Sequence, residues 1–387
     1  MYVLIIYLLL GVAALYSLLA GEKRNIKVEW ILYGGVVLLF VFRFSLGQDT
    51  DVYSWLFSNV TNPLKDALHS HTMRNVVFTT YAFLIKLVVK EFRWFVFVSN
   101  LIFFGVITWI VKQHSDYPLV SLLLVVGSGL LEVYAGSGLR QAMATVLFLY
   151  AFYEFLPKKQ FVLYELFILM AIGCQEIAAA AVPIPLLYLL GKRFKEHPYR
   201  VTAILVLIGV AMLEVTYDGL PRIENYFINQ YGYAPVWTHV LAYFHDREFS
   251  IAGIGMEAVF LIGIMILFYL SDQKQHTDFF RLELLTFIYS TVIYFAMSMY
   301  PLMSRCSDLL QSIMIVLVPE LFSMIVSKRR VCASFAAVFL LNGFLLFVDL
   351  NEKCKYLTSS GLWETSITTY PYVTVFDAST VHGLPLD

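Results

Sequence analysis

Long apolar runs separated by short polar segments dominate this sequence. Most runs have roughly 18 to 25 residues, the length of a helix that crosses about 30 Å of hydrocarbon. The pattern therefore predicts an all-α, polytopic integral membrane protein with about eleven or twelve spans. The predicted spans are 2–20, 28–46, 75–90, 94–111, 117–135, 138–156, 160–190, 199–217, 251–270, 278–298, 307–326 and 331–349.

Composition supports a membrane protein and excludes several other classes. Hydrophobic residues make up 59% of the chain and charged residues only 14%, too few to cover a soluble core of this size. The formal net charge of -1 gives no reason to expect nucleic acid as a partner. The four cysteines have no metal-like or paired spacing, so we expect no metal site. The first run lacks a basic leader and a cleavage site, which indicates a first helix rather than a signal peptide.

Basic clusters suggest which loops face the cytoplasm. Lys23, Arg24 and Lys27 follow the first run, so the positive-inside rule places this loop inside and the N-terminus outside. We therefore expect one transmembrane domain over 1–349, with external loops at about 47–74 and 218–250 and a polar external tail over 350–387. The other basic clusters are Lys158–Lys159, Lys192–Arg193–Lys195, Lys274 and Lys328–Arg329–Arg330.

The run 160–190 is too long for one simple span and is interrupted. Gln175, Glu176, Pro183 and Pro185 lie within it, which favours a broken helix or a pair of half-helices. A pair adds one crossing, so another segment must fail to cross. We expect 75–90 to lie flat or re-enter, which places the start of 138–156 on the outer side.

Three arginines lie at the ends of predicted spans. Arg43 ends the second span, Arg140 opens the sixth, and Arg305 precedes the eleventh. An arginine deep in a membrane costs about 2.5–3.5 kcal/mol on insertion scales, so it needs a partner, a route to the headgroups or an anionic ligand. Guanidinium groups bind phosphate through two hydrogen bonds and stay charged. We expect the three to converge on one external pocket that binds a lipid-linked diphosphate.

Other polar residues accompany these arginines. Asp49 is suited to cap a helix in which Tyr53 lies one turn later, or else Asp49 or Asp51 serves as a base or orients Arg43. Gln141 could bind a sugar hydroxyl or a neighbouring helix. Gln175 and Glu176 lie deep in an apolar run, where a carboxylate is functional or pairs with an arginine. Glu257, Glu283 and Glu320 are expected to be structural partners or end-of-span residues rather than catalysts.

Two short motifs resemble those of a known family. Arg43, Gly47, Asp49 and Tyr53 match the R-x3-G-x-D-x3-Y pattern of the EpsG-like, Wzy-type exopolysaccharide and O-antigen polymerases. The segment 138–144 resembles the G-[IL]-R-Q-x-[IL]-A motif of that family at the expected distance. This chain departs from the family at Gln175–Glu176, where relatives usually have a histidine followed by a small residue, and in lacking the usual Glu-x-Gly turn before the third span.

The resemblance implies a GT-C-like or Wzy-like helical bundle that acts as a metal-independent polysaccharide polymerase. A growing glycan would pass from undecaprenyl diphosphate to an incoming lipid-linked repeat unit at the outer face of the bacterial cytoplasmic membrane. No cofactor is implied, and the partners would be the lipid-linked oligosaccharide, membrane lipid, a chain-length regulator and a flippase. By physical reasoning from the residues, we expect the catalytic residues to be Asp49, Arg140 and Glu176, and the substrate-binding residues to be Arg43, Asp51, Tyr53, Gln141, Gln175 and Arg305.

Two other functions are compatible with parts of the pattern. A GT-C type glycosyltransferase that uses a polyprenyl-phosphate sugar would place an acidic pair such as Asp49 and Asp51 on an early external loop. In those enzymes the acidic pair usually follows the first span, whereas Asp49 and Asp51 follow the second. A large soluble domain often supports the pair, and this sequence has no such domain. A flippase for lipid-linked oligosaccharides would favour two similar bundles, and the sequence shows no such duplication.

Overall fold

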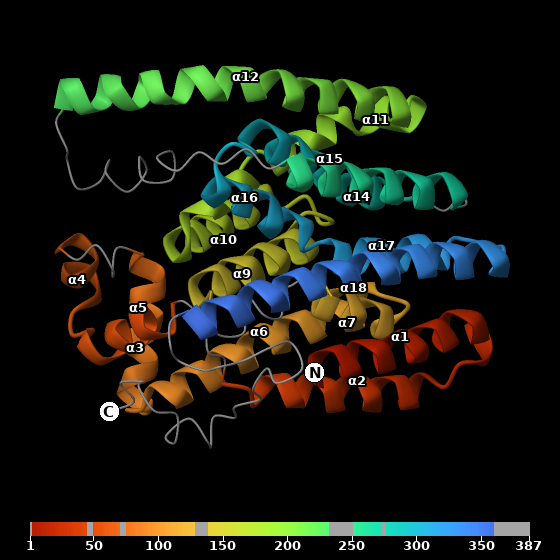
Figure 1. The fold of residues 1–387 in the computed structure, drawn as a ribbon, viewed down its shortest axis with the longest axis horizontal. Helices are drawn as coiled ribbons and strands as arrows, with labels where there is room; N and C mark the ends of the chain where they lie inside the picture. The colour runs from red at the N-terminus through yellow and green to blue at the C-terminus, as the bar shows by residue number, and fades with distance from the viewer. Residues whose placement is uncertain are drawn as a thin grey trace.

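The computed structural model describes residues 2–44, 49–69, 75–127, 138–231, 251–271 and 276–359. Over these ranges all regular elements are helices, which confirms the predicted all-α fold (Figure 1). The elements are α1 (Tyr2–Ala20), η1 (Gly21–Lys23), α2 (Ile26–Val41), α3 (Thr50–Asn59), α4 (Pro63–His69), α5 (Val76–Val88), α6 (Phe92–His114), α7 (Pro118–Gly127), α9 (Leu139–Phe155), α10 (Phe161–Cys174), η3 (Glu176–Ala181), η4 (Ile184–Leu187), α11 (Tyr188–Glu196), α12 (Pro198–Tyr231), α14 (Ile251–Leu270), α15 (Asp278–Met297), α16 (Pro301–Gln311), α17 (Met314–Ser323) and α18 (Lys328–Ser359).

Seven segments of the described chain are helical, long and apolar enough to cross a membrane. The pair α16 and α17 makes an eighth if it counts as one span, with a bend of 42° at its break. The protein is therefore a multi-pass membrane protein, as predicted. The expected eleven or twelve spans also include the shorter apolar helices α7 and α10, so the exact number stays a prediction.

The long run 160–190 is broken where the polar residues interrupt it. Helix α10 ends at Cys174, Gln175 is extended (φ -156°, ψ 127°), and the 3-10 helix η3 starts at Glu176. The hydroxyl of Tyr188, which starts α11, donates to the carbonyl of Leu156 (2.8 Å), next to the start of α10. The chain thus returns to the end where α10 began, so the run is broken as predicted, and its second part belongs to a segment, Glu176–Glu196, that is itself long enough to cross a membrane.

Helix α5 is shorter than the membrane-spanning helices and runs in another direction. Its 13 residues span only about 20 Å, shorter than the hydrocarbon core. In Figure 1 it runs across the direction of the long helices, at the same end as α3 and α4. Nζ of Lys86 near its C-terminus donates to the carbonyls of Ser58 (2.6 Å) and Val60 (3.1 Å), which joins α5 to the end of α3. These features agree with the expectation that 75–90 lies flat or re-enters, which stays a prediction.

The basic loops meet at one end of the bundle. Arg24 lies over the ring of Tyr117 at 4.5 Å, and Nζ of Lys328 donates to the carbonyl of Leu19 at 3.1 Å. The loop after α1, the loop before α7 and the start of α18 are therefore neighbours. Helix α3 and the N-terminus of α9 lie at the opposite end. Which end faces the cytoplasm rests on the positive-inside rule and stays a prediction.

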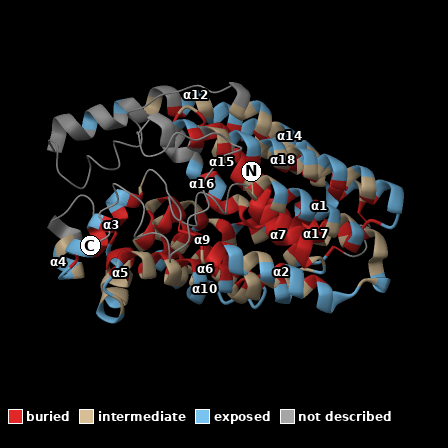
Figure 2. Cartoon of the chain, turned by 60° about the horizontal axis from the view of Figure 1, so that its bottom comes forward, coloured by how far each residue is buried: buried red, intermediate tan, exposed pale blue. Residues whose placement is uncertain are grey.

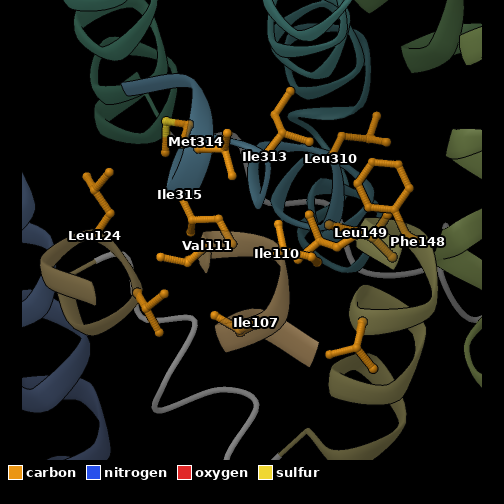
Figure 3. Close-up of a cluster of buried hydrophobic side chains, with 14 of the residues drawn as sticks. Ile107, Ile110, Val111, Leu124, Phe148, Leu149, Leu310, Ile313, Met314 and Ile315 are labelled. Carbon is orange, nitrogen blue, oxygen red and sulfur yellow. The ribbon is translucent and has the colours of Figure 1, made fainter. Parts of the chain in front are cut away.

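The core is formed by α6, α7, α9, α16 and α17. Buried aliphatic and aromatic side chains from these helices interlock in Figure 3, and Figure 2 shows buried positions gathered on α7, α9 and α17. Large apolar side chains on the outer helices are exposed instead, among them Val12 (71%), Leu207 (67%) and Leu340 (70%). An apolar outer surface of this kind suits contact with lipid chains.

Two helices extend beyond their predicted ends. Helix α18 continues past 349 to Ser359, and α12 continues past 217 to Tyr231. Polar residues such as Lys355 are good helix formers, so a change to polar composition marks the edge of an apolar span without ending the helix. The rest of the expected external loop, 232–250, and of the tail, 360–387, lies outside the described residues.

Candidate functional site

The N-terminus of α9 is the centre of the candidate site. Gly138 is its N-cap residue, Leu139 is buried against the core, and Arg140 lies in the first turn. The first backbone N–H groups of a helix have no partner within the helix, and this end carries a partial positive charge. Arg140 therefore adds a full charge where backbone donors are already available for an anion.

Arg140 joins three helices through its own contacts. Its Nη1 donates to Oδ1 of Asn75, the N-cap residue of α5, at 3.1 Å. Both its backbone N–H and its guanidinium group donate to the phenol oxygen of Tyr53 on α3, and Cζ lies 5.7 Å from the centre of that ring. The predicted site residues Tyr53 and Arg140 are thus brought together.

Asp49 connects Arg140 with Arg305. The Asp49 carboxyl is half-buried at the start of α3 and interacts electrostatically with both guanidinium groups. Burial raises the pKa of Asp49, and the charges of Arg140 and Arg305 oppose this rise. Asp49 occupies the N-cap position as predicted, but its side chain makes no capping hydrogen bond. The carboxyl therefore interacts with the two arginines and does not cap its own helix.

The break after α10 adds a second carboxylate to this region. Glu176 interacts electrostatically with Arg140, as the sequence interpretation allowed. Gln175 beside it is only 5% exposed, and its Oε1 has no hydrogen-bond partner in the described part of the protein. A buried amide oxygen without a donor costs free energy unless a ligand or water supplies one.

Arg305 lies within α16 rather than before a span, because this helix begins at Pro301. Proline is favoured at the first position of a helix, since its missing N–H needs no partner there. The Arg305 side chain is exposed, and Asp308, one turn later, interacts with it electrostatically. The segment η3 packs against both α16 and α9, so it lies between the two helices that carry Arg305 and Arg140.

The other predicted residues are placed differently. Arg43 is buried just after α2, with Cζ 5.7 Å from the ring centre of Tyr2, and its carbonyl accepts from Nδ2 of Asn100 (3.0 Å). Its convergence with Arg140 and Arg305 stays a prediction. Gln141 is buried in α9, whereas Asp51 on α3 is exposed.

Two residues of this region were not selected as site residues from the sequence. Asn75 precedes a short apolar run, a position typical of a helix cap, and this signal could have marked it. Asp308 follows Arg305 at i+3, so a helical reading from Pro301 would have placed both on one face.

These features define a multi-pass membrane protein with a charged cluster at one end of its helical bundle. The chain belongs to the EpsG family, whose model matches residues 29–363, most of the chain. This is the family of exopolysaccharide or Wzy-type polymerases, and it assigns the protein to polysaccharide biosynthesis. No curated protein and no solved structure matched the chain.

Proposed function

We propose that this protein polymerises lipid-linked oligosaccharide repeat units at the outer face of the bacterial cytoplasmic membrane. A growing glycan on undecaprenyl diphosphate is transferred to the non-reducing sugar of an incoming unit. The observation that carries this proposal is that the guanidinium groups of Arg140 and Arg305 both interact with the Asp49 carboxyl, beside the N-terminus of α9. Two guanidinium groups and a helix N-terminus together suit a diphosphate.

The diphosphate is the leaving group of the proposed reaction. The bond between the anomeric carbon and a diphosphate oxygen breaks, and undecaprenyl diphosphate leaves with the electron pair. Preorganised donors stabilise the charge that develops on the leaving oxygen. Nε of Arg140 is buried and has no hydrogen-bond partner among the described residues, which leaves this N–H for a phosphate oxygen.

A carboxylate activates the acceptor sugar by accepting a proton from its hydroxyl group. The acceptor hydroxyl oxygen forms the new glycosidic bond, and its proton passes to Asp49 or Glu176 as general base. Both interact with Arg140, so the base and the leaving-group site are adjacent. Burial raises the pKa of Asp49 towards the range in which a carboxylate is an effective proton acceptor. Tyr53 orients the guanidinium group of Arg140 in this scheme.

The reaction uses neither a nucleotide sugar nor a metal ion. A flippase would supply the lipid-linked units from the cytoplasmic side, and a chain-length regulator would act as a further partner. O-antigen, capsule and secreted exopolysaccharide are all products of this reaction class.

The test is polymerisation by the full-length protein reconstituted in lipid, with undecaprenyl diphosphate-linked repeat units as substrate and the products separated on a gel. Wild type should give a ladder, and Arg140→Ala should lower the rate of chain extension about 100-fold or more, the usual effect of removing one preorganised donor. Arg43→Ala, tested alongside, would show whether that arginine belongs to the same pocket.

Arg93→Ala is the matched control, because Arg93 opens α6 near α3 and its ion pair is with Glu91. This variant should still give the ladder. If folded wild type gives no ladder from a matched substrate, the polymerase proposal fails, and a transferase of single sugars or a flippase becomes the better interpretation.

A further inference from the structure

A second polar cluster lies within the bundle, next to the site of Arg140 and Arg305. Glu257 on α14 is only 6% exposed and accepts hydrogen bonds from Oγ1 of Thr291 on α15 (2.9 Å) and Nε2 of Gln311 on α16 (2.5 Å). Nε2 of Gln311 also donates to Oγ of Ser307 (3.0 Å). A carboxylate, an amide and two hydroxyl groups thus meet across three helices.

The cluster lies at one depth, close to the end of the bundle that carries Arg305. Glu257 is six residues from the start of α14, and Thr291 is six residues from the end of α15. At 1.5 Å per residue, both lie about 9 Å from that end of their helices. The cluster is therefore a polar layer inside the membrane-spanning part, where ionisable residues are costly and usually functional.

Asp308 connects this layer with the arginine site. It lies one turn from Arg305 and one turn from Gln311 on α16, and it interacts electrostatically with Arg305 and Glu257. Its side chain is exposed, whereas its neighbours Ser307 and Leu309 are buried. Arg305 thus stands between two carboxylates, Asp49 on one side and Asp308 on the other.

A purely structural clamp between α14, α15 and α16 would need only the hydrogen bonds of Glu257. It would not account for the exposed carboxylate of Asp308. Such a clamp would also not explain Gln175, whose buried Oε1 has no hydrogen-bond partner in the described chain. Gln175 is the N-cap residue of η3, and η3 packs on α16 and α9. Both groups, the Asp308 carboxylate and the Gln175 amide oxygen, are hydrogen-bond acceptors, so they point to a ligand that donates hydrogen bonds.

We propose that Asp308, Glu257 and Gln311 form a subsite that binds the hydroxyl groups of the acceptor sugar. The subsite has two carboxylates, and of these Asp308 interacts with the guanidinium group of Arg305, so the subsite favours neutral, hydroxyl-rich groups over phosphate. Sugar hydroxyls donate to carboxylate oxygens and to amide oxygens such as Oε1 of Gln311, whose two N–H groups are already used by Glu257 and Ser307. The inference rests on the proposed polymerase function and divides its site: Arg140 holds the diphosphate, Asp308 holds the acceptor sugar, and Arg305 separates the two.

The test compares two probes that each fill one part of the site. Binding to the full-length protein in lipid nanodiscs is measured for undecaprenyl diphosphate and, separately, for the free repeat-unit oligosaccharide released from the host polysaccharide. Asp308→Asn and Gln311→Leu should weaken binding of the oligosaccharide about 10-fold or more. Both variants should bind undecaprenyl diphosphate within about twofold of wild type, which also shows that they fold.

Glu320→Gln is the control, because Glu320 is an intramembrane acid next to Glu283 and Tyr153, away from this cluster. It should bind both probes as wild type does. Unchanged oligosaccharide binding in Asp308→Asn and Gln311→Leu, or no oligosaccharide binding by wild type, would overturn the subsite even if the wild-type ladder forms. Absence of the ladder despite binding of both probes would overturn the polymerase function instead.

Discussion

The phenol oxygen of Tyr53 accepts hydrogen bonds from both the backbone N–H and the guanidinium group of Arg140. One side chain from α3 therefore satisfies a free N–H at the N-terminus of α9 and fixes the cation in its first turn. Helix α3 lies at one end of the bundle to which α9 belongs, so this contact restrains the Arg140 side chain between the two helices. Asn75 of α5 completes the support at 3.1 Å.

Tyr53→Phe should reduce both stability and polymerisation. The ring still lies beside the guanidinium group, but two buried donors lose their acceptor, at a cost of about 1–3 kcal/mol. We expect a lower thermal unfolding midpoint and a markedly slower ladder in the polymerisation assay. Tyr81→Phe is the control, because the Tyr81 hydroxyl pairs with Oγ of Ser99 on α6 (2.8 Å). Equal activity of Tyr53→Phe and wild type would show that this contact does not position Arg140.

Polymerisation should be lost in acid as Asp49 becomes protonated. Burial raises the pKa of Asp49 above its usual 3.8. In a plot of polymerisation rate against pH, the fall in rate on the acid side (the acid limb) should therefore lie above pH 3.8. The charge of Arg305 lowers this pKa, and Arg305→Gln should therefore move the acid limb to higher pH. The measurement is the initial rate of ladder formation against pH for both proteins. An acid limb that is the same in both, or that moves to lower pH in Arg305→Gln, would contradict the role of Asp49.

The parts of the site that lie within one motif could be predicted from the sequence. Gly138–Arg140 marked the start of α9, and Gln175–Glu176 with two later prolines marked the break after α10. Both signals are local, since they depend on caps and on residues that cannot continue a helix.

The contacts between distant residues could not be predicted in this way. Asn75 meets Arg140 across 65 positions of the chain, and Glu257 meets Gln311 across 54. Helical periodicity assigns a residue to a face of its own helix but does not say which helix packs against that face. For the same reason the position of Arg43 over Tyr2 was not expected.

Lys86→Met should loosen α3 and slow polymerisation indirectly. The Lys86 ammonium group donates to two carbonyls at the C-terminal end of α3, where a positive charge is favourable. Methionine keeps the apolar stem but removes both hydrogen bonds, so we expect a loss of about 1–2 kcal/mol in the free energy of unfolding. Lys86→Arg should retain most of the stability, and the exposed Lys90→Met should unfold like wild type. Equal unfolding midpoints for Lys86→Met and wild type would show that α3 needs no such anchor.

Gly173→Ala should destabilise the contact between α10 and α5 that supports Asn75. A Cβ at Gly173 would clash with Cγ2 of Val77 and lie 3.1 Å from its Cβ. Valine is branched at Cβ and cannot turn away, so we expect overpacking to cost about 1–3 kcal/mol. Adding Val77→Ala should restore the unfolding midpoint, because it removes the methyl groups that clash. Gly105→Ala is the control, since no atom lies within 4 Å of its Cβ position. The prediction is wrong if Gly173→Ala alone unfolds at the wild-type temperature, because the two helices would then separate freely without disturbing Asn75 and Arg140.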